Sequence, residues 1–197
     1  MARLVLILGG ARSGKSRFAQ DLAARLNETG VLFVATAEAG DAEMRERIQI
    51  HRRSRPADWE TLECPINVGA TLAQSADRHT VVVVDCLTLL VSNILLAVAD
   101  SNPQRAQGLV EAETASLLAA CRKRQGTVII VSGEVGQGVV PGNSLGRTFR
   151  DLLGWANQAL AAESTATYLM VAGFPVEVRS LAASVEAAAT ALRREET

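Results

Sequence analysis

The stretch "GGARSGKS", residues 9–16, constrains the fold of this chain more than any other feature. It fits the pattern G-x-x-x-x-G-K-[ST], in which glycines let backbone N–H groups point inward at phosphate oxygens. Lys15 would then supply a positive charge to the outer phosphates, and the Ser16 hydroxyl is a ligand for Mg²⁺. An apolar run precedes the motif and an amphipathic pattern follows it. This context predicts a phosphate-binding loop between a strand and a helix, formed by Gly9, Gly10, Ala11, Arg12, Ser13, Gly14, Lys15 and Ser16.

Short β-rich runs alternate with longer helical patterns along the rest of the chain. Strands are predicted at 3–8, 31–35, 80–85, 127–132 and 167–172, with a short extra strand at 59–63. Helices are predicted at 15–28, 41–53, 66–77, 88–98, 103–124, 145–163 and 180–195. Because the strands are continuously apolar, helices should cover both faces of a mostly parallel sheet in an α/β fold. "VAGFPVEVR", residues 171–179, favours a terminal hairpin with one antiparallel edge.

Length and composition narrow the class of protein. The 197 residues predict a single domain over 1–197. A net charge of −1 disfavours nucleic acid as a partner, and the apolar runs are too short for an integral membrane segment. No cleavable signal precedes the first strand, and the three cysteines have no metal-ligand spacing, so we expect a cytoplasmic protein with reduced thiols. Trp59, Trp155 and the phenylalanines are expected in the core, and His79 in a surface loop.

Acidic residues near the predicted strand ends are candidates for metal and ligand contacts. Asp85 ends a buried strand, where a carboxylate would face the phosphates and hold Mg²⁺, although it also suits the cap of the following helix. Glu134 follows another strand in a glycine-rich loop, which is either a ligand-binding loop or simply a mobile one. Arg147 and Arg150 lie three apart on one helix face, where they would meet a phosphate or pair with Asp151 and Glu163.

The segment "RIQIHRRSRP", residues 47–56, places His51 among four arginines. Positive neighbours disfavour the imidazolium, favour the neutral nucleophilic ring and attract polyanions. The alternative is a helix end whose cations complement the helix dipole, with a histidine on the surface. The segment alone favours the helix end with a surface histidine, because runs of charge are usually solvated faces.

Five stretches together resemble one family. They are "LILGGARSGKSRFAQ", "VATAEAGDAEMRERIQIHRRSRPADWETLE", "VVVDCLTLLVSN", "EVGQGVVPGNSLGRTFRDLLGWANQALA" and "YLMVAGFPV". In this order they are similar to the bifunctional adenosylcobinamide kinase/adenosylcobinamide-phosphate guanylyltransferases of cobalamin assembly. The family has an asparagine just before "EVG", where this chain has Gly133.

The resemblance implies a RecA-like P-loop fold, a homotrimer and two activities. The first would phosphorylate adenosylcobinamide with ATP or GTP. The second would transfer GMP from GTP to adenosylcobinamide-phosphate and give adenosylcobinamide-GDP. His51 falls on the family's guanylylated histidine, and Lys15 would serve both steps. The resemblance places GTP contacts at Gly9 to Ser16 and at Val34, Ala35, Thr36, Arg52, Arg53, Ser54, Arg55, Glu63 and Asp85.

With this context we interpret His51 as the nucleophile that attacks the α-phosphate of GTP, with Ser16 and Asp85 as Mg²⁺ ligands. Two alternatives stay open. One is a P-loop small-molecule kinase without guanylyl transfer, in which His51 is structural. The other is a nucleotide-switched RecA-like binding module.

Overall fold

A computed structural model describes residues 2–27, 30–38, 40, 42–53, 55–75, 78–98 and 103–194 of the chain. The strands are β1 (Arg3–Gly9), β2 (Val31–Ala35), β3 (Glu60–Glu63), β4 (Val81–Asp85), β5 (Thr127–Val131), β6 (Ala166–Val171) and β7 (Phe174–Glu177). The helices are α1 (Lys15–Leu26), α2 (Ala42–Arg53), α3 (Val68–Gln74), α4 (Leu87–Ala97), α5 (Pro103–Lys123), α6 (Ser144–Glu163) and α7 (Val185–Arg194). The predicted order of elements is confirmed.

One sheet joins the seven strands in the order β3-β2-β4-β5-β1-β6-β7. The pairs β2–β3, β2–β4, β4–β5, β1–β5 and β1–β6 are all parallel. The last pair, β6–β7, is antiparallel and forms the predicted hairpin. The predicted α/β fold with a mostly parallel sheet is therefore confirmed, and the carboxyl ends of β1, β2, β4 and β5 meet at one edge.

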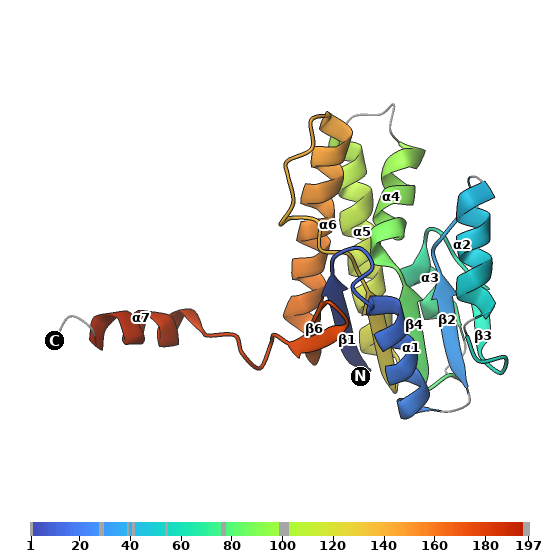
Figure 1. Cartoon of the computed structure of the whole chain (residues 1–197), viewed down its shortest axis with the longest axis horizontal. Coiled ribbons are helices and arrows are strands. Elements are labelled where there is room, and N and C mark those ends of the chain that lie inside the picture. Colours follow the sequence, from blue (N-terminus) through green and yellow to red (C-terminus); the bar gives the residue numbers. More distant parts are fainter. Residues whose placement is uncertain are drawn as a thin grey trace.

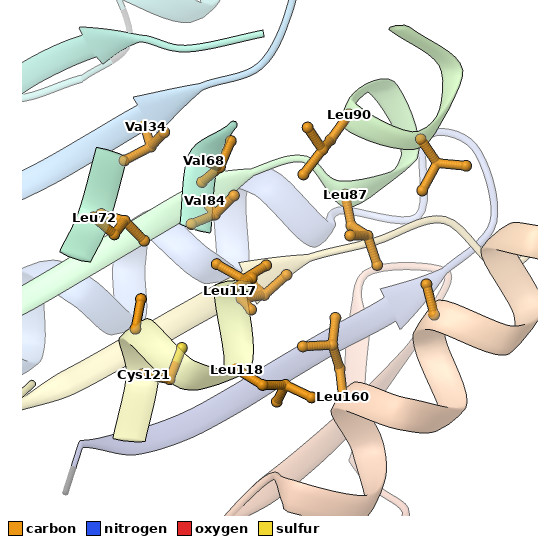
Figure 2. Packing of buried hydrophobic residues seen from close by; sticks show 14 of the residues in the cluster. Val34, Val68, Leu72, Val84, Leu87, Leu90, Leu117, Leu118, Cys121 and Leu160 are labelled. Atoms are coloured by element: carbon orange, nitrogen blue, oxygen red, sulfur yellow. The ribbon is translucent and has the colours of Figure 1, made fainter. Parts of the chain in front are cut away.

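Side chains alternate between the two faces of the sheet, as the period of a strand requires. In β1, Leu4 and Leu6 pack in the larger core cluster, whereas Val5 and Ile7 pack in the smaller one. The larger cluster lies under α3 to α6, and Figure 2 shows Leu87 of α4 and Leu117 of α5 turned toward the sheet. The smaller cluster lies under α1. Both faces are covered, which explains why the buried strands read as continuous apolar runs.

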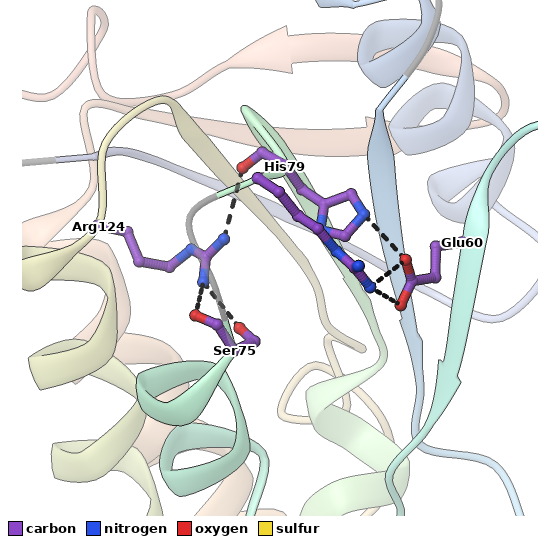
Figure 3. Close-up of polar contacts among 5 residues, drawn as sticks. Glu60, Ser75, His79 and Arg124 are labelled. Atoms are coloured by element: carbon purple, nitrogen blue, oxygen red, sulfur yellow. Dashed lines mark hydrogen bonds and ion pairs between the residues drawn. The ribbon is translucent and has the colours of Figure 1, made fainter.

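The expectation of a surface position for His79 is wrong. His79 is only 8% exposed, and its Nε2 lies 3.2 Å from a carboxylate oxygen of Glu60, which Arg78 also binds. Nearby, buried Arg124 donates to Ser75 Oγ at 2.8 Å, at the end of α3 (Figure 3). It also donates to the carbonyl of Leu72 at 3.2 Å. These bonds offset part of the cost of burying the two side chains. Contacts between residues so far apart in the chain cannot be predicted from local sequence patterns.

The aromatic residues divide between core and surface. Trp59 and Phe33 are buried as predicted, but Trp155 is 41% exposed and Phe174 is 74% exposed, so the core assignment is wrong for these two. Phe174 begins β7, the outer strand of the sheet, which has no further strand beyond it. Trp155 lies on α6 next to a buried alanine, on a side of the helix turned away from the sheet.

The C-terminal helix α7 stands apart from the rest of the fold. Figure 1 shows it extending away from β7, and the predicted start at residue 180 is five residues too early. Leu181, Val185 and Leu192 are all largely exposed. None of the described helices is long and apolar enough to cross a membrane.

Two glycines allow a paired test of the helix packing. A Cβ built on Gly69 of α3 would lie 2.4 Å from the backbone nitrogen of Leu117 in α5, whereas one built on Gly108 of α5 would meet nothing within 4 Å. We therefore expect Gly69→Ala to lower the free energy of unfolding by about 1–3 kcal/mol, because α3 and α5 must move apart. Gly108→Ala should instead raise it by roughly 0.5–1 kcal/mol through helix propensity. Urea unfolding of both variants measures this, and equal effects would contradict the close packing of these helices.

Candidate active site

The residues of the motif form the connection between β1 and α1. Gly14 has a φ of 95°, a left-handed conformation that residues with a side chain rarely adopt, and it caps α1. The backbone nitrogen of Gly173, at the β6–β7 turn, donates to the carbonyl of Ser13 at 3.1 Å. This bond connects the loop to the β6–β7 hairpin. Lys15 opens α1, and its Nζ donates to the carbonyl of Gly10 at 2.6 Å. The loop therefore has its predicted place at a helix N-terminus, which favours bound anions.

Asp85 lies at the end of β4, on the face of the sheet that carries this loop. Val82 and Val84 point into the cluster under α3 to α6, so alternation turns Asp85 toward the α1 face. Partial burial lowers the pKa of Lys15, and the nearby charge of Asp85 opposes this effect. Cys86, not Asp85, is the N-cap residue of α4, so the helix-cap alternative for Asp85 is wrong.

Thr36 joins the carboxyl ends of β2 and β4. Its hydroxyl accepts a hydrogen bond from the backbone nitrogen of Cys86 at 2.7 Å and donates one to the carbonyl of Cys86 at 2.8 Å. The backbone nitrogen of Thr36 donates to the carbonyl of Asp85. Asn93 of α4 donates to the carbonyls of Thr36, at 2.8 Å, and Pro65, at 3.0 Å. The family resemblance implies a contact at Thr36, whereas no local motif marks Asn93.

The thiol of Cys86 sits beside Asp85 without being a reactive group. Burial, with a further contribution from the Asp85 charge, raises the pKa of Cys86 to about 11. The thiolate is the nucleophilic form of cysteine. Cys86 therefore stays protonated at neutral pH and contributes no nucleophile to this edge of the sheet.

A cavity of about 530 Å³ opens where β2 and β3 end beside α2. Arg52 and Glu63, which both line it, form an exposed ion pair at 3.4 Å that contributes little to stability. Of the predicted contacts, Ala35, Arg52, Arg55 and Glu63 line the cavity, whereas Val34 is fully buried in the core and Arg53 is exposed outside it. The other described residues of the lining are Ala37, Glu38, Gly40, Ile48 and Pro65. Ser54 lies outside the described residues.

Arg55, which lines the cavity, is held by contacts with neighbouring side chains. Its guanidinium lies 3.6 Å from the ring centre of Phe33, a cation–π contact, and its Nη1 is 3.5 Å from the hydroxyl of Thr61. Its Nε is buried without a hydrogen-bond partner among the described residues. Burial lowers the pKa of Arg55, and the charge of Asp85 opposes that effect. Asp85 thus acts electrostatically on both Lys15 and Arg55.

The backbone of His51 lies in α2, between Ile48 and Arg52. Both of these neighbours line the cavity, so His51 sits on the helix segment that borders it. The described part of the chain does not include the side chain of His51. The structure therefore gives the position of this residue in the fold, and its role stays a prediction.

The loop after β5 lies directly beside the phosphate-binding loop. The nitrogen of Glu134 donates to the carbonyl of Gly9 at 3.0 Å. Arg150 and Arg147 donate to carbonyls of this loop, at Gly136 and at Pro141 and Gly142, respectively. The alternative in which the two arginines pair with Glu163 is wrong, because Glu163 binds Arg122 of α5. Arg147 and Arg150 instead fix the backbone of the loop.

Comparison with known proteins identifies a family. The model of the family described as "Cobinamide kinase / cobinamide phosphate guanyltransferase" matches residues 5–178. The bifunctional adenosylcobalamin biosynthesis protein CobP of Pseudomonas aeruginosa is 45% identical over 174 residues, which cover 88% of this chain and 96% of that protein. CobU of Salmonella typhimurium, a bifunctional adenosylcobalamin biosynthesis protein, is 37% identical over 182 residues, 89% of this chain and 99% of that protein. The matched region ends just before α7.

A solved structure supports the fold. The ATPase domain of G40P superposes with a TM-score of 0.50 at 14% identity, covering 85% of this chain and 69% of that one. At this identity the likeness bears on the architecture alone. It agrees with the RecA-like P-loop fold that the family resemblance implies.

The link between β2 and β4 can be tested at Thr36. We expect Thr36→Val to lower the free energy of unfolding by about 1–3 kcal/mol, because the buried nitrogen of Cys86 loses its acceptor. Thr36→Ser keeps the hydroxyl and should cost clearly less. Chemical denaturation of the two variants and the wild type measures the difference. Equal losses for valine and serine would contradict this account, because serine keeps the hydroxyl that valine lacks.

Proposed function

The chain belongs to the cobinamide kinase / cobinamide phosphate guanyltransferase family, and from this premise we propose that it catalyses two successive steps. In the first, adenosylcobinamide is phosphorylated with ATP or GTP. In the second, GMP is transferred from GTP to adenosylcobinamide-phosphate through a histidine–GMP intermediate, which gives adenosylcobinamide-GDP. We further propose a homotrimer that works in the cytoplasm.

One observation supports the proposal most strongly. The phosphate-binding loop, Asp85 and the helix that carries His51 lie at the same edge of the sheet, and a cavity with Arg52 and Arg55 borders that helix. In parallel α/β sheets this edge is where ligands bind. Two arginines, Arg52 and Arg55, line the cavity together with Glu38 and Glu63, and the arginines suit a nucleoside triphosphate because they attract its negative charge.

In the proposed mechanism, the N–H groups of residues 9–16 and the Lys15 ammonium hold the phosphates. The neutral imidazole of His51 attacks the α-phosphorus of GTP, a nitrogen–phosphorus bond forms, and pyrophosphate leaves with the electron pair of the broken bond. An oxygen of the acceptor's phosphate then attacks the same phosphorus, and His51 leaves. Arg52 and Arg55 offset the negative charge that builds up on the phosphates.

Ser16 and Asp85 are the residues proposed to hold Mg²⁺. They supply a hydroxyl and a carboxylate oxygen, and Asp85 faces the side of the sheet on which Lys15 and the loop lie. Mg²⁺ is commonly bound by one or two protein oxygens together with substrate phosphates, and this pair fits that requirement. When bound, the ion would neutralise part of the phosphate charge.

Substitution of His51 and Lys15 should separate the two steps. We expect His51→Ala to abolish guanylyl transfer and to spare phosphorylation of adenosylcobinamide, because only the second step needs the nucleophile. Lys15→Ala should reduce both steps, on the order of 100-fold or more, because both use the phosphate-binding loop. The rates are measured separately, with adenosylcobinamide and ATP for the kinase and with adenosylcobinamide-phosphate and GTP for the transfer.

Lys123→Ala is the matched control, since this exposed lysine of α5 lies outside the proposed site and should leave both rates unchanged. Equal loss of both activities in folded His51→Ala would contradict the division of roles. Guanylyl transfer that persists without His51 would refute the histidine–GMP intermediate.

A further inference from the structure

The order of strands places the loop that carries Glu134 between the phosphate-binding loop and Asp85. β5 pairs with β1 on one side and with β4 on the other. The residues after β5 therefore emerge between the phosphate-binding loop, which follows β1, and Asp85, which ends β4. Glu134 is the carboxylate of this connection. Neighbouring strands lie about 4.8 Å apart, so this connection begins about that distance from the end of β1 and from the end of β4.

Four hydrogen bonds hold the backbone around Glu134. Ser132 donates its N–H to the carbonyl of Ile7 at 2.9 Å, and Glu134 donates to Gly9 at 3.0 Å. The nitrogen of Gly133 donates to the hydroxyl of Thr88 at 2.6 Å, and its carbonyl accepts from the amide of Asn157 at 3.1 Å. These bonds tie the loop to β1, α4 and α6. The position of Glu134 relative to the phosphate-binding loop is therefore fixed before any ligand binds.

The carboxylate of Glu134 is half-buried and oriented by its own loop. Its Oε1 accepts from the nitrogen of Gly136 at 2.6 Å, and the carbonyl of Gly136 accepts from Arg150 at 2.8 Å. An ionised carboxylate offers about four acceptor positions on its two oxygens. The bond to Gly136 thus orients the carboxylate of Glu134, and its remaining acceptor positions can accept a hydrogen bond from a hydroxyl group.

We propose that Glu134 is the proton acceptor of the kinase step. This inference rests on the proposed function. The hydroxyl oxygen of the acceptor forms a bond to the γ-phosphorus, and the bond between that phosphorus and the β-bridging oxygen breaks. ADP leaves with the electron pair when ATP is the donor, and the hydroxyl proton moves to the carboxylate of Glu134. The protonated Glu134 then returns its proton to solvent.

Other described carboxylates at this edge fit the task less well. Glu63 ends β3, four strand spacings or about 19 Å from β1, and it is paired with Arg52. Asp85 interacts with both Lys15 and Arg55, and it is the proposed metal ligand. Glu134 is the carboxylate whose backbone bonds directly to the phosphate-binding loop.

The two steps differ in their need for a base, and this difference makes the proposal testable. The kinase acceptor is an alcohol, which must lose a proton as it attacks. The acceptor of guanylyl transfer is a phosphate monoester, which is already an anion at neutral pH. Loss of the base should therefore slow only the first step.

The test substitutes Glu134→Gln, which keeps an oxygen to accept from Gly136 but removes the negative charge. We expect kcat of the kinase to fall about 100-fold or more, with little change in the KM for ATP. Guanylyl transfer to adenosylcobinamide-phosphate, measured on the same preparation, should stay within about threefold of the wild type and so also reports that the variant is folded. Glu134→Asp, which retains a carboxylate, should recover part of the kinase activity. Glu186→Gln, on exposed α7, is the matched control and should change neither rate.

Two results would overturn the proposal. Kinase activity of Glu134→Gln close to the wild-type value would show that the carboxylate takes no proton. Loss of both steps together would show that Glu134 acts on the structure of the loop and not on one reaction. A wild-type protein that lacks both activities would instead refute the proposed function, so the two failures are distinguishable.

Discussion

The parallel direction of β1, β5, β4 and β2 is the constraint on which the rest of the structure depends. Parallel strands end at the same edge, so the connections that follow them gather there although they are far apart in the sequence. The phosphate-binding loop, the loop of Glu134, Asp85 and Thr36 all occupy this edge. Two helical layers cover the faces of the sheet and leave this edge accessible to a ligand.

At that edge, Asp85 influences the pKa values of two cations. The carboxylate acts on Lys15, which belongs to the phosphate-binding loop, and on Arg55, which lines the cavity beside α2. Both cations are partly buried, and burial alone disfavours their charged forms. Asp85 opposes this effect and so supports two cations that a triphosphate would contact from different sides. Thr36 fixes the same strand end by bonding both backbone groups of Cys86.

Local patterns were sufficient to predict the elements of the fold and the position of the phosphate-binding loop. Strong apolar runs and the spacing of glycines, Lys15 and Ser16 act over short stretches, and the predicted strands and hairpin are present. Long-range contacts could not be predicted in this way. The burial of His79 depends on Glu60, and the link from Thr36 to Cys86 and the contact of Asn93 join residues about 50 positions apart. Trp155 and Phe174 are exposed because of how α6 and β7 are placed, which hydrophobicity alone does not indicate.

The most direct test of the account is to look for GMP on His51. The protein is incubated with Mg²⁺ and GTP labelled at the α-phosphate, then denatured, and the bound label is tested for the acid lability and base stability of a phosphoramidate. The same incubation uses GTP labelled at the γ-phosphate, and both are repeated with His51→Ala. The account predicts label from the α position only, absent from the variant. No retained label, or equal label on His51→Ala, would contradict the histidine–GMP intermediate and favour a P-loop kinase without guanylyl transfer.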